Sequence, residues 1–269
     1  MNEQPENPEP VSDKRSGIHQ IKSWRGYLFE FILLFLAVFL GFVAENFRQT
    51  INEREQAEEL AHNFYDELLE DSTAIRWYID ARFMKDTALI KLKNYVLDSG
   101  LERVSKGFVK NYYTGLFLNS RFEPTDVRLE QLKNSGSLVY FKSQELQRLT
   151  GSLSECIARM RQFDTYDAEY LQDQIFPFHI EHGDQAFVDR ITKDGEINFG
   201  DMLGILSTNT VKIDYHINNL PNFSRRKFNN VIGLYRSRLK MVTFHHYLRY
   251  EDINKRLLAL LRKEYHITK

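Results

Sequence analysis

The chain has few of the residues on which several common classes of protein depend. Its 269 residues include a single cysteine, Cys156, which excludes an intramolecular disulfide and any site built on paired cysteines. Lys and Arg total 36 against 37 Asp and Glu, giving a formal net charge of −1. This balance lacks the basic surplus of a dedicated nucleic-acid binder, so we predict no nucleic-acid partner.

Sequence motifs for common catalytic chemistry are also absent. The chain contains neither GxGxxG nor GxxxxGK[ST], so a phosphate-binding loop for nucleotides has no support. It also contains no GxSxG elbow for a nucleophilic serine and no HExxH zinc motif. We therefore predict no catalytic residue, no cofactor and no metal site, and we do not expect an enzyme.

Proline is scarce, and half of it lies at the N-terminus. Pro5, Pro8 and Pro10 account for three of the six prolines, among polar residues with hardly an apolar one. This composition predicts a disordered tail over residues 1–23. Such a tail is too short to be an output domain, which argues against a chemoreceptor or a sensor kinase.

A long apolar run follows the tail. Tyr27–Ala44 reads YLFEFILLFLAVFLGFVA and contains one charged residue, Glu30. Eighteen helical residues span roughly 27 Å, close to the hydrocarbon thickness of a bilayer. A buried soluble helix would rarely be apolar around its whole circumference, and the exit lacks the small residues of a signal-peptide cleavage site. We predict a transmembrane anchor over residues 24–46, in contact with the lipid bilayer through Tyr27–Ala44.

The flanking charges predict the orientation of this anchor. Four Lys and Arg residues precede the apolar run, whereas only Arg48 and Arg54 follow it closely. By the positive-inside rule, the N-terminus is cytoplasmic and residues 47–269 form an extramembrane domain, periplasmic if the membrane is a bacterial inner membrane. Glu30 lies near the cytoplasmic interface, where it either helps anchoring and helix contact or has a relay or partner-binding role.

Helical periodicity dominates the rest of the chain, and strict alternation is almost absent. The predicted fold class is therefore all-α: a single N-terminal transmembrane helix running into an irregular helical bundle. One predicted core stripe consists of Ile75, Ile79, Phe83, Ile90 and Val96. Predicted stops are Ser99-Gly100, Asn134-Ser135-Gly136 and Pro177, a loop or partial strand is expected over His182–Gly204, and a last helix is expected after Pro221.

Charge is distributed unevenly along the extramembrane domain. Glu53–Asp71 carries eight acidic residues and one basic residue, whereas Tyr215–Tyr250 carries seven basic residues and no acidic one. One interpretation is that the last helix packs beside the first with complementary charges. The other is a basic face for anionic lipid headgroups or an acidic partner.

Three groups of side chains are candidates for a metal, catalytic or ligand-binding site. His179, Glu181, His182 and Asp184 combine imidazoles and carboxylates, but solvated polar residues at a helix exit are favoured over a metal site. Cys156 lies in an apolar helical stripe, which favours a buried structural thiol over a nucleophile. Six aromatic residues are expected to fill the core, with a ligand pocket between their helices as the alternative: Tyr112, Tyr113, Phe117, Phe163, Tyr166 and Tyr170.

Two further segments are distinctive. The first is GYLFEFILLFLAVFLGFVAENFRQ (Gly26–Gln49), followed by an acidic helix that ends in Glu67–Ser72. The second is LEQLKNSGSLVYFKSQEL (Leu129–Leu146). Together they resemble a bacterial family of uncharacterised single-pass membrane proteins, a domain-of-unknown-function family, in which the second segment is similar to a turn between helices.

Individual positions of the first segment add to this resemblance. Glu30, Gly41 and Asn46 match the family's early Glu, late Gly and following Asn, whereas Phe47 stands where the family more often has Trp. The resemblance implies an N-terminal anchor and a helical outer domain, and it implies no activity.

These observations favour a membrane-anchored interaction or scaffolding protein of the bacterial envelope, whose helical domain binds another envelope protein or its own copies. The alternative is a ligand-binding, sensor-like or enzymatic domain with a pocket between aromatic-rich helices.

Overall fold

A computed structural model describes residues 24–141, 143–193, 195–208 and 213–268. The chain divides into two compact units, Met1–Glu53 and Arg54–Lys269, which we describe separately. The described residues form helices and no strand, so the predicted all-α fold class is confirmed. The predicted tail, residues 1–23, lies outside the described residues.

The first unit contains the apolar segment of helix α1, which spans Trp24–Asp98. Its most apolar window has no buried side chain, so this segment is not the core helix of a soluble unit. By length and composition, α1 is the one described helix that is long and apolar enough to cross a membrane.

The second unit contains the rest of α1 and the remaining helices. The longer ones are α2 (Lys106–Phe117), α4 (Gln144–Tyr170), α8 (Arg225–Val242) and α9 (Leu248–Tyr265). The shorter ones are α3 (Val127–Asn134), η1 (Ser137–Tyr140), α5 (Phe176–His182), α6 (Gln185–Thr192), α7 (Phe199–Ile205) and η3 (Leu220–Asn222). Two π-helical segments complete the set, η2 (Leu171–Ile175) between α4 and α5 and η4 (Thr243–Tyr247) between α8 and α9.

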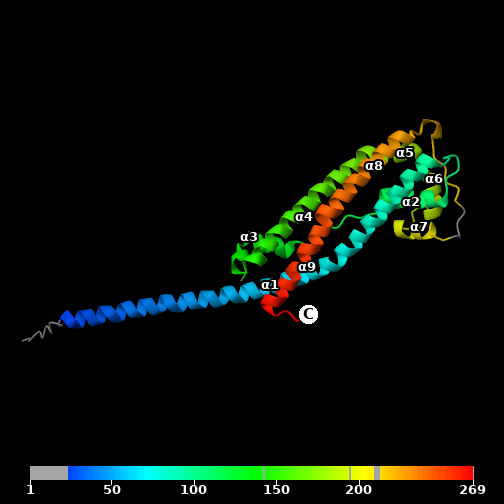
Figure 1. Ribbon diagram of the computed structural model, residues 1–269. Coiled ribbons are helices and arrows are strands. Elements are labelled where there is room, and N and C mark those ends of the chain that lie inside the picture. The colour runs from blue at the N-terminus through cyan, green and yellow to red at the C-terminus, as the bar shows by residue number, and fades with distance from the viewer. Residues whose placement is uncertain (1–23, 142, 194, 209–212, 269) are drawn as a thin grey trace, which may run out of the picture. The chain divides into compact units, whose positions relative to one another are not determined.

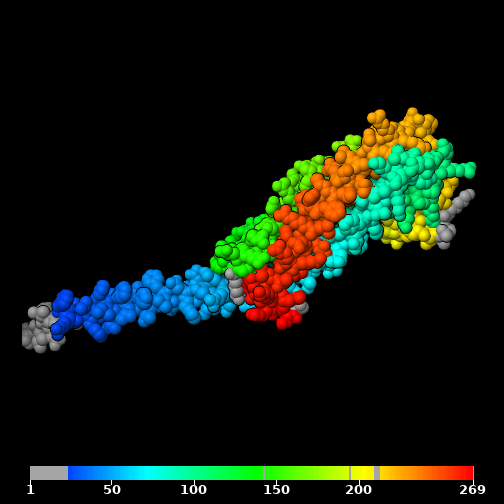
Figure 2. All heavy atoms as spheres, viewed as in Figure 1, coloured from blue at the N-terminus to red at the C-terminus, as the bar shows by residue number. Residues whose placement is uncertain are grey.

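Long helices lie side by side along this unit (Figure 1). α4 packs against α8 and α9, and ion pairs join α8 and α9 to α1. On the face that Figure 2 shows, α8 and α9 run between α4 and the part of α1 that belongs to this unit. The predicted helical bundle is therefore built around α1, α4 and the α8–α9 pair.

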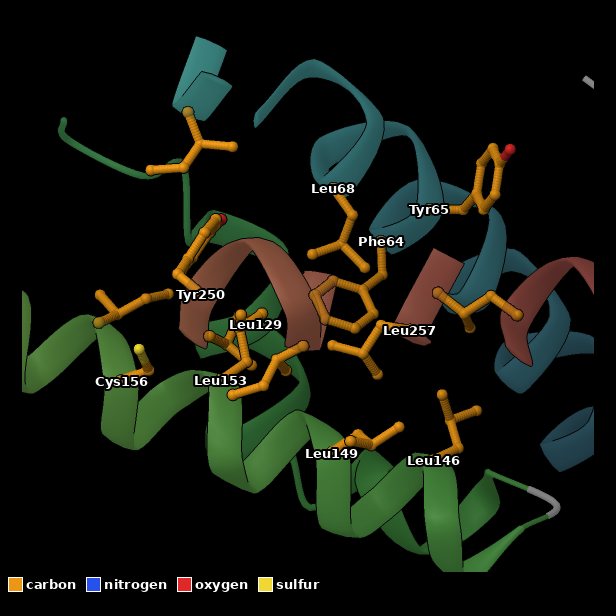
Figure 3. Packing of buried hydrophobic residues seen from close by; sticks show 14 of the residues in the cluster. Phe64, Tyr65, Leu68, Leu129, Leu146, Leu149, Leu153, Cys156, Tyr250 and Leu257 are labelled. Carbon is orange, nitrogen blue, oxygen red and sulfur yellow. The ribbon is translucent and has the colours of Figure 1, made fainter. Parts of the chain in front are cut away.

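One hydrophobic core joins α1, α4 and α9. Phe64 and Leu68 of α1 point toward Leu257 of α9 and toward Leu149 and Leu153 of α4 (Figure 3). All five side chains are almost fully buried, and burying a Leu or Phe side chain stabilises the fold by about 1.5–3 kcal/mol.

A second hydrophobic core joins α1, α2 and α8 to the short helices α5, α6 and α7. α1 contributes Leu89, Leu92 and Val96 to it. Gly115 of α2 permits close approach here, because a Cβ at this position would lie 3.0 Å from Leu89 Cδ2. The two cores therefore share one helix, α1, along successive stretches of its length.

Several predicted boundaries are confirmed by the structure. α1 ends at Asp98, just before Ser99-Gly100, and α3 ends before Gly136, whose φ of 71° lies in the left-handed region that glycine adopts at helix ends. Ser143 caps α4 by accepting a hydrogen bond from the Leu146 amide at 3.0 Å. The last helical stretch begins after Pro221, as predicted.

Two predicted boundaries are wrong. Helix does not stop at Pro177, because Phe176 N–H bonds to Leu171 O in the π-helical register and Pro177 then falls in the first turn of α5, where no N–H is needed. The stretch His182–Gly204 contains α6 and α7 rather than a loop or partial strand. Asp184 and Asn198 are the N-caps of these two helices. The Gly and Asp content of the stretch favoured a loop prediction, although Asp and Asn are also common N-cap residues.

Two acidic residues of α1 bind the N-terminal end of α3 and the segment just before it. Glu67 Oε2 accepts a hydrogen bond from Arg128 N–H at 2.8 Å, at the N-terminus of α3, whose own N-cap Asp126 makes no side-chain cap. Asp71, one turn further along α1, accepts from Thr125 N–H and from the Tyr250 hydroxyl, the latter at 2.6 Å. Burial raises the pKa of both carboxyls above the ordinary range. Part of the acidic Glu53–Asp71 run therefore joins helices from within.

We predict that Glu67→Ala lowers the free energy of unfolding by about 1–2 kcal/mol, because it leaves the first amides of α3 without an acceptor. The matched control is Glu70→Ala on the exposed side of α1, expected to change stability by less than about 0.5 kcal/mol. Chemical denaturation of the two variants measures the difference. Equal stabilities would show that the contact from Glu67 to α3 contributes nothing.

A buried charged cavity as candidate functional site

The inward face of α1 is interrupted by two cations. Buried positions recur at helical spacing through Leu68, Ile75 and Ile79, and resume at Leu89 and Leu92. Between the two apolar stretches the same face carries Arg82 and Lys85, which are 3% and 4% exposed. Of the predicted core stripe, Ile75, Ile79 and Val96 are buried, whereas Phe83 is 42% exposed, so the prediction is wrong at Phe83.

Arg82 is held by neutral groups. Its Nε donates to Thr243 Oγ1 at 2.8 Å, and its terminal nitrogens donate to the carbonyl oxygens of Ser120 and Leu239 at 3.3 and 3.4 Å. The guanidinium carbon lies 4.1 Å from the centre of the Tyr247 ring, in cation–π geometry. No carboxylate among the described residues lies within 4.0 Å of this guanidinium to form an ion pair.

Lys85 lies one helical turn further along and is also held without an acid. Its Nζ donates to Leu118 O at 3.0 Å and lies 5.2 Å from the centre of the Tyr235 ring. Among the described residues it forms no ion pair. Burial, together with the nearby charge of Arg82, lowers the pKa of Lys85 to about 7.

Two acids of α4 line the same region but pair elsewhere. Asp164 is 7% exposed and lies 3.4 Å from Arg121 Nε, while Asp167 lies 3.2 Å from Arg238 Nε. Burial raises the pKa of Asp164 to about 6 and also raises the pKa of Asp167. The charge of Arg82 opposes this rise in both carboxyls, so Asp164 and Asp167 act on Arg82 at longer range although neither forms an ion pair with it.

A cavity of about 270 Å³ lies among these groups. Arg82, Lys85, Asp164 and Asp167 line it together with the segment Leu116–Arg121. Apolar parts of the lining come from Leu171, Phe176, Tyr235 and Leu239. The cavity therefore combines buried charge with an apolar wall, the usual composition of a small-molecule site.

Both π-helical segments contribute to this region. Leu171 of η2 lines the cavity, and Thr243 and Tyr247 of η4 contact Arg82. π-Helical turns cost hydrogen-bond geometry and occur frequently at functional sites. Here η4 coincides with the residues that hold Arg82, and η2 permits the helix to continue into Phe176.

The four residues considered as metal ligands each have another partner, and only Glu181 and His182 approach one another, with 3.7 Å between Oε2 and Nε2. His179 Nδ1 hydrogen-bonds with the Tyr112 hydroxyl at 2.9 Å, and His182 Nδ1 with Asn218 O at 3.0 Å. Glu181 accepts from Asn219, while Asp184 caps α6. No group of three or more metal-ligating side chains is assembled in the part of the chain that the structure describes. Burial lowers the pKa of His179.

Cys156 is a buried thiol, as predicted. It is 1% exposed, and its Sγ donates to His246 O at 3.4 Å. Burial raises the pKa of this thiol to about 11, so it is protonated near neutral pH and is a poor nucleophile.

The six predicted core aromatics differ in how far they are buried. Tyr112 and Tyr113 are buried in the second core, whereas Tyr166 is 43% exposed. Phe117, Phe163 and Tyr170 are half-buried against the two cores. A cavity of about 400 Å³ adjoins Tyr113, Phe117 and His179, which is where the predicted alternative of an aromatic pocket falls.

The basic stretch Tyr215–Tyr250 packs beside α1, but its arginines Arg225 and Arg236 do not pair with the acidic Glu53–Asp71 run. Arg236 pairs with Asp86 at 2.7 Å, and Arg225 donates to the carbonyl oxygens of Val96 and Ser99, the latter at 2.8 Å. A cation at these last carbonyls stabilises the C-terminal end of α1. Arg225 and Arg236 thus contact α1 beyond its acidic Glu53–Asp71 run.

We predict that Lys85→Met raises the free energy of unfolding by about 1–3 kcal/mol at pH 6.5, because it removes a buried cation that has no acid partner. Below pH 7, Lys85 is charged in both the folded and the unfolded chain, so the folded chain carries the full free-energy cost of burying this charge. Above pH 7, the folded chain releases the proton while the unfolded chain keeps it until about pH 10.5. The gain of the variant over the native chain therefore falls as the pH rises.

Thermal and denaturant unfolding of the full chain from pH 6 to pH 9 measures this difference. The matched control is Lys91→Met, which removes an exposed lysine from the same helix and is expected to show no such pH dependence. A constant difference between Lys85→Met and the native chain over this range would contradict the buried charge.

No protein-family model, curated protein or solved structure matches the chain. The resemblance of Gly26–Gln49 and Leu129–Leu146 to a family of single-pass membrane proteins therefore stays a prediction.

Proposed function

We propose that this protein is a single-pass membrane protein of the bacterial envelope whose helical domain is an interaction module. The observation that carries the proposal is the apolar segment Tyr27–Ala44 of α1, none of which is buried by the rest of the chain. A run of apolar side chains exposed on every side of a helix requires an apolar surrounding, and a bilayer supplies one.

A groove on the helical domain supports a role in binding another protein. It has a volume of about 650 Å³ and lies between α1, α2 and α7. Phe83 and Met84 of α1 line it and are 42% and 55% exposed, and Leu203 of α7 adds a third apolar side chain. Lys91 and Lys110 stand among the lining residues, so an apolar centre with polar neighbours faces solvent, as in many protein interfaces.

The surplus of basic residues before the apolar segment favours a cytoplasmic N-terminus and a periplasmic helical domain. We predict that a membrane-impermeant maleimide labels Ser237→Cys but not Ser12→Cys in intact cells, and labels both after permeabilisation. Ser237 is exposed on α8, and buried Cys156, replaced by Ser in both variants, leaves no background. Labelling of Ser12→Cys alone in intact cells would reverse the orientation.

A photoreactive amino acid in place of Met84 tests the groove as an interaction surface. We predict a discrete cross-linked adduct in membranes that contain the full chain, of twice its mass for self-association or of another mass for a second protein. The matched control is the same substitution at Val139, which is 71% exposed but lies on η1, away from the groove. Equal adducts at both positions, or none at either, would contradict an interaction through this groove.

A further inference from the structure

The cavity beside Arg82 and Lys85 is lined by two buried cations that form no ion pair among the described residues. Each acid of α4 that lines it lies within 3.4 Å of an arginine other than Arg82. The charge of Arg82 acts on both of these acids only at longer range. A buried cation is stabilised most by an anion in direct, hydrogen-bonded contact, and neither Arg82 nor Lys85 has such a contact in the part of the chain that the structure describes.

Both cations have hydrogen atoms left to donate. Lys85 carries three N–H groups and uses one, on Leu118 O. Arg82 carries five and uses three, on Thr243, Ser120 and Leu239. Because the two residues are three apart on one helix face, their side chains are neighbours and line one cavity. A carboxylate has two oxygens and can accept from both.

The other walls of the cavity set the rest of the ligand. Phe117 and Phe176 line it with their ring centres 5.9 Å apart, and Leu171 lies in the same wall. A volume of about 270 Å³ is the share of about nine water molecules, which suits a compound of about that many non-hydrogen atoms. The nearby carboxylates of Asp164 and Asp167 disfavour an anion of higher charge.

We propose that this cavity binds a small organic carboxylate, with its anionic group between Arg82 and Lys85 and its apolar part against Phe117, Phe176 and Leu171. This site is separate from the groove proposed for protein binding, which is lined by the outward side of α1. The helical domain then carries a ligand site on the inward face of α1 and an interaction surface on its outward face.

Four probes of similar size or charge test the ligand class on the full chain in detergent at pH 6.5. They are benzoate, its neutral analogue benzamide, the cation benzylamine and inorganic phosphate. We expect 10 mM benzoate to raise the melting temperature by about 3 °C or more through binding linkage, and the other three to raise it by less than about 1 °C. An equal shift with benzamide or phosphate, or a larger shift with benzylamine, would overturn the proposal.

Two variants test the location of the site by calorimetric titration with benzoate. Lys85→Met removes one cation, and Ala168→Phe places a large side chain at the cavity from an exposed position of α4. We expect each to weaken benzoate binding at least tenfold. The matched controls, Lys91→Met on α1 and Ala158→Phe at another exposed position of α4, should bind as the native chain does.

Unchanged binding in both Lys85→Met and Ala168→Phe would place the benzoate elsewhere and overturn the proposal. If Lys85→Met proves poorly folded by its helical circular dichroism, Ala168→Phe decides, because its wild-type side chain is exposed and contributes no core packing.

Discussion

The helical domain depends on a single helix face that must serve two cores. Apolar side chains of α1 before Arg82 hold α4 and α9, and those after Lys85 hold α2 and α8. Because both cores use the same face, the register of α1 couples them. At the junction, that face carries Arg82 and Lys85 instead of apolar residues. The chain thus places its least favourable buried groups where the two cores meet, and the surrounding elements are arranged to hold them.

The need to hold Arg82 and Lys85 explains two features of the fold that hydrophobic packing alone does not. The π-helical turn η4 supplies the hydroxyl and ring that hold Arg82, and the segment Leu118–Arg121 supplies carbonyl oxygens to both cations. Neutral acceptors satisfy the hydrogen-bonding needs of a cation but not its charge. A domain with two buried cations between its cores is less stable than one with apolar residues at the same positions. Such a loss of stability is expected where residues serve ligand binding instead of packing.

Much of the fold could be predicted from the sequence, but the charged centre could not. Helical periodicity and turn residues such as Gly136 predicted the all-α class, and the apolar run predicted a helix suited to a membrane. The predicted core stripe included Phe83 and not Arg82, because no local pattern in the sequence shows that η4 and Leu118–Arg121 supply acceptors to a buried cation. The predicted helix end at Pro177 is wrong for a similar reason, because the spacing of apolar residues in the sequence does not reveal a π-helical turn.

Lys85 is buried without an ion-pair partner among the described residues, and this burial can be measured directly. The measurement is an NMR titration of the full chain labelled with ¹³C at the lysine side-chain ε-carbon, with the Lys85 signal assigned by its loss in Lys85→Met. We expect this signal to titrate near pH 7, while exposed lysines titrate near their ordinary value of about 10.4. Titration of Lys85 together with the exposed lysines would contradict this burial.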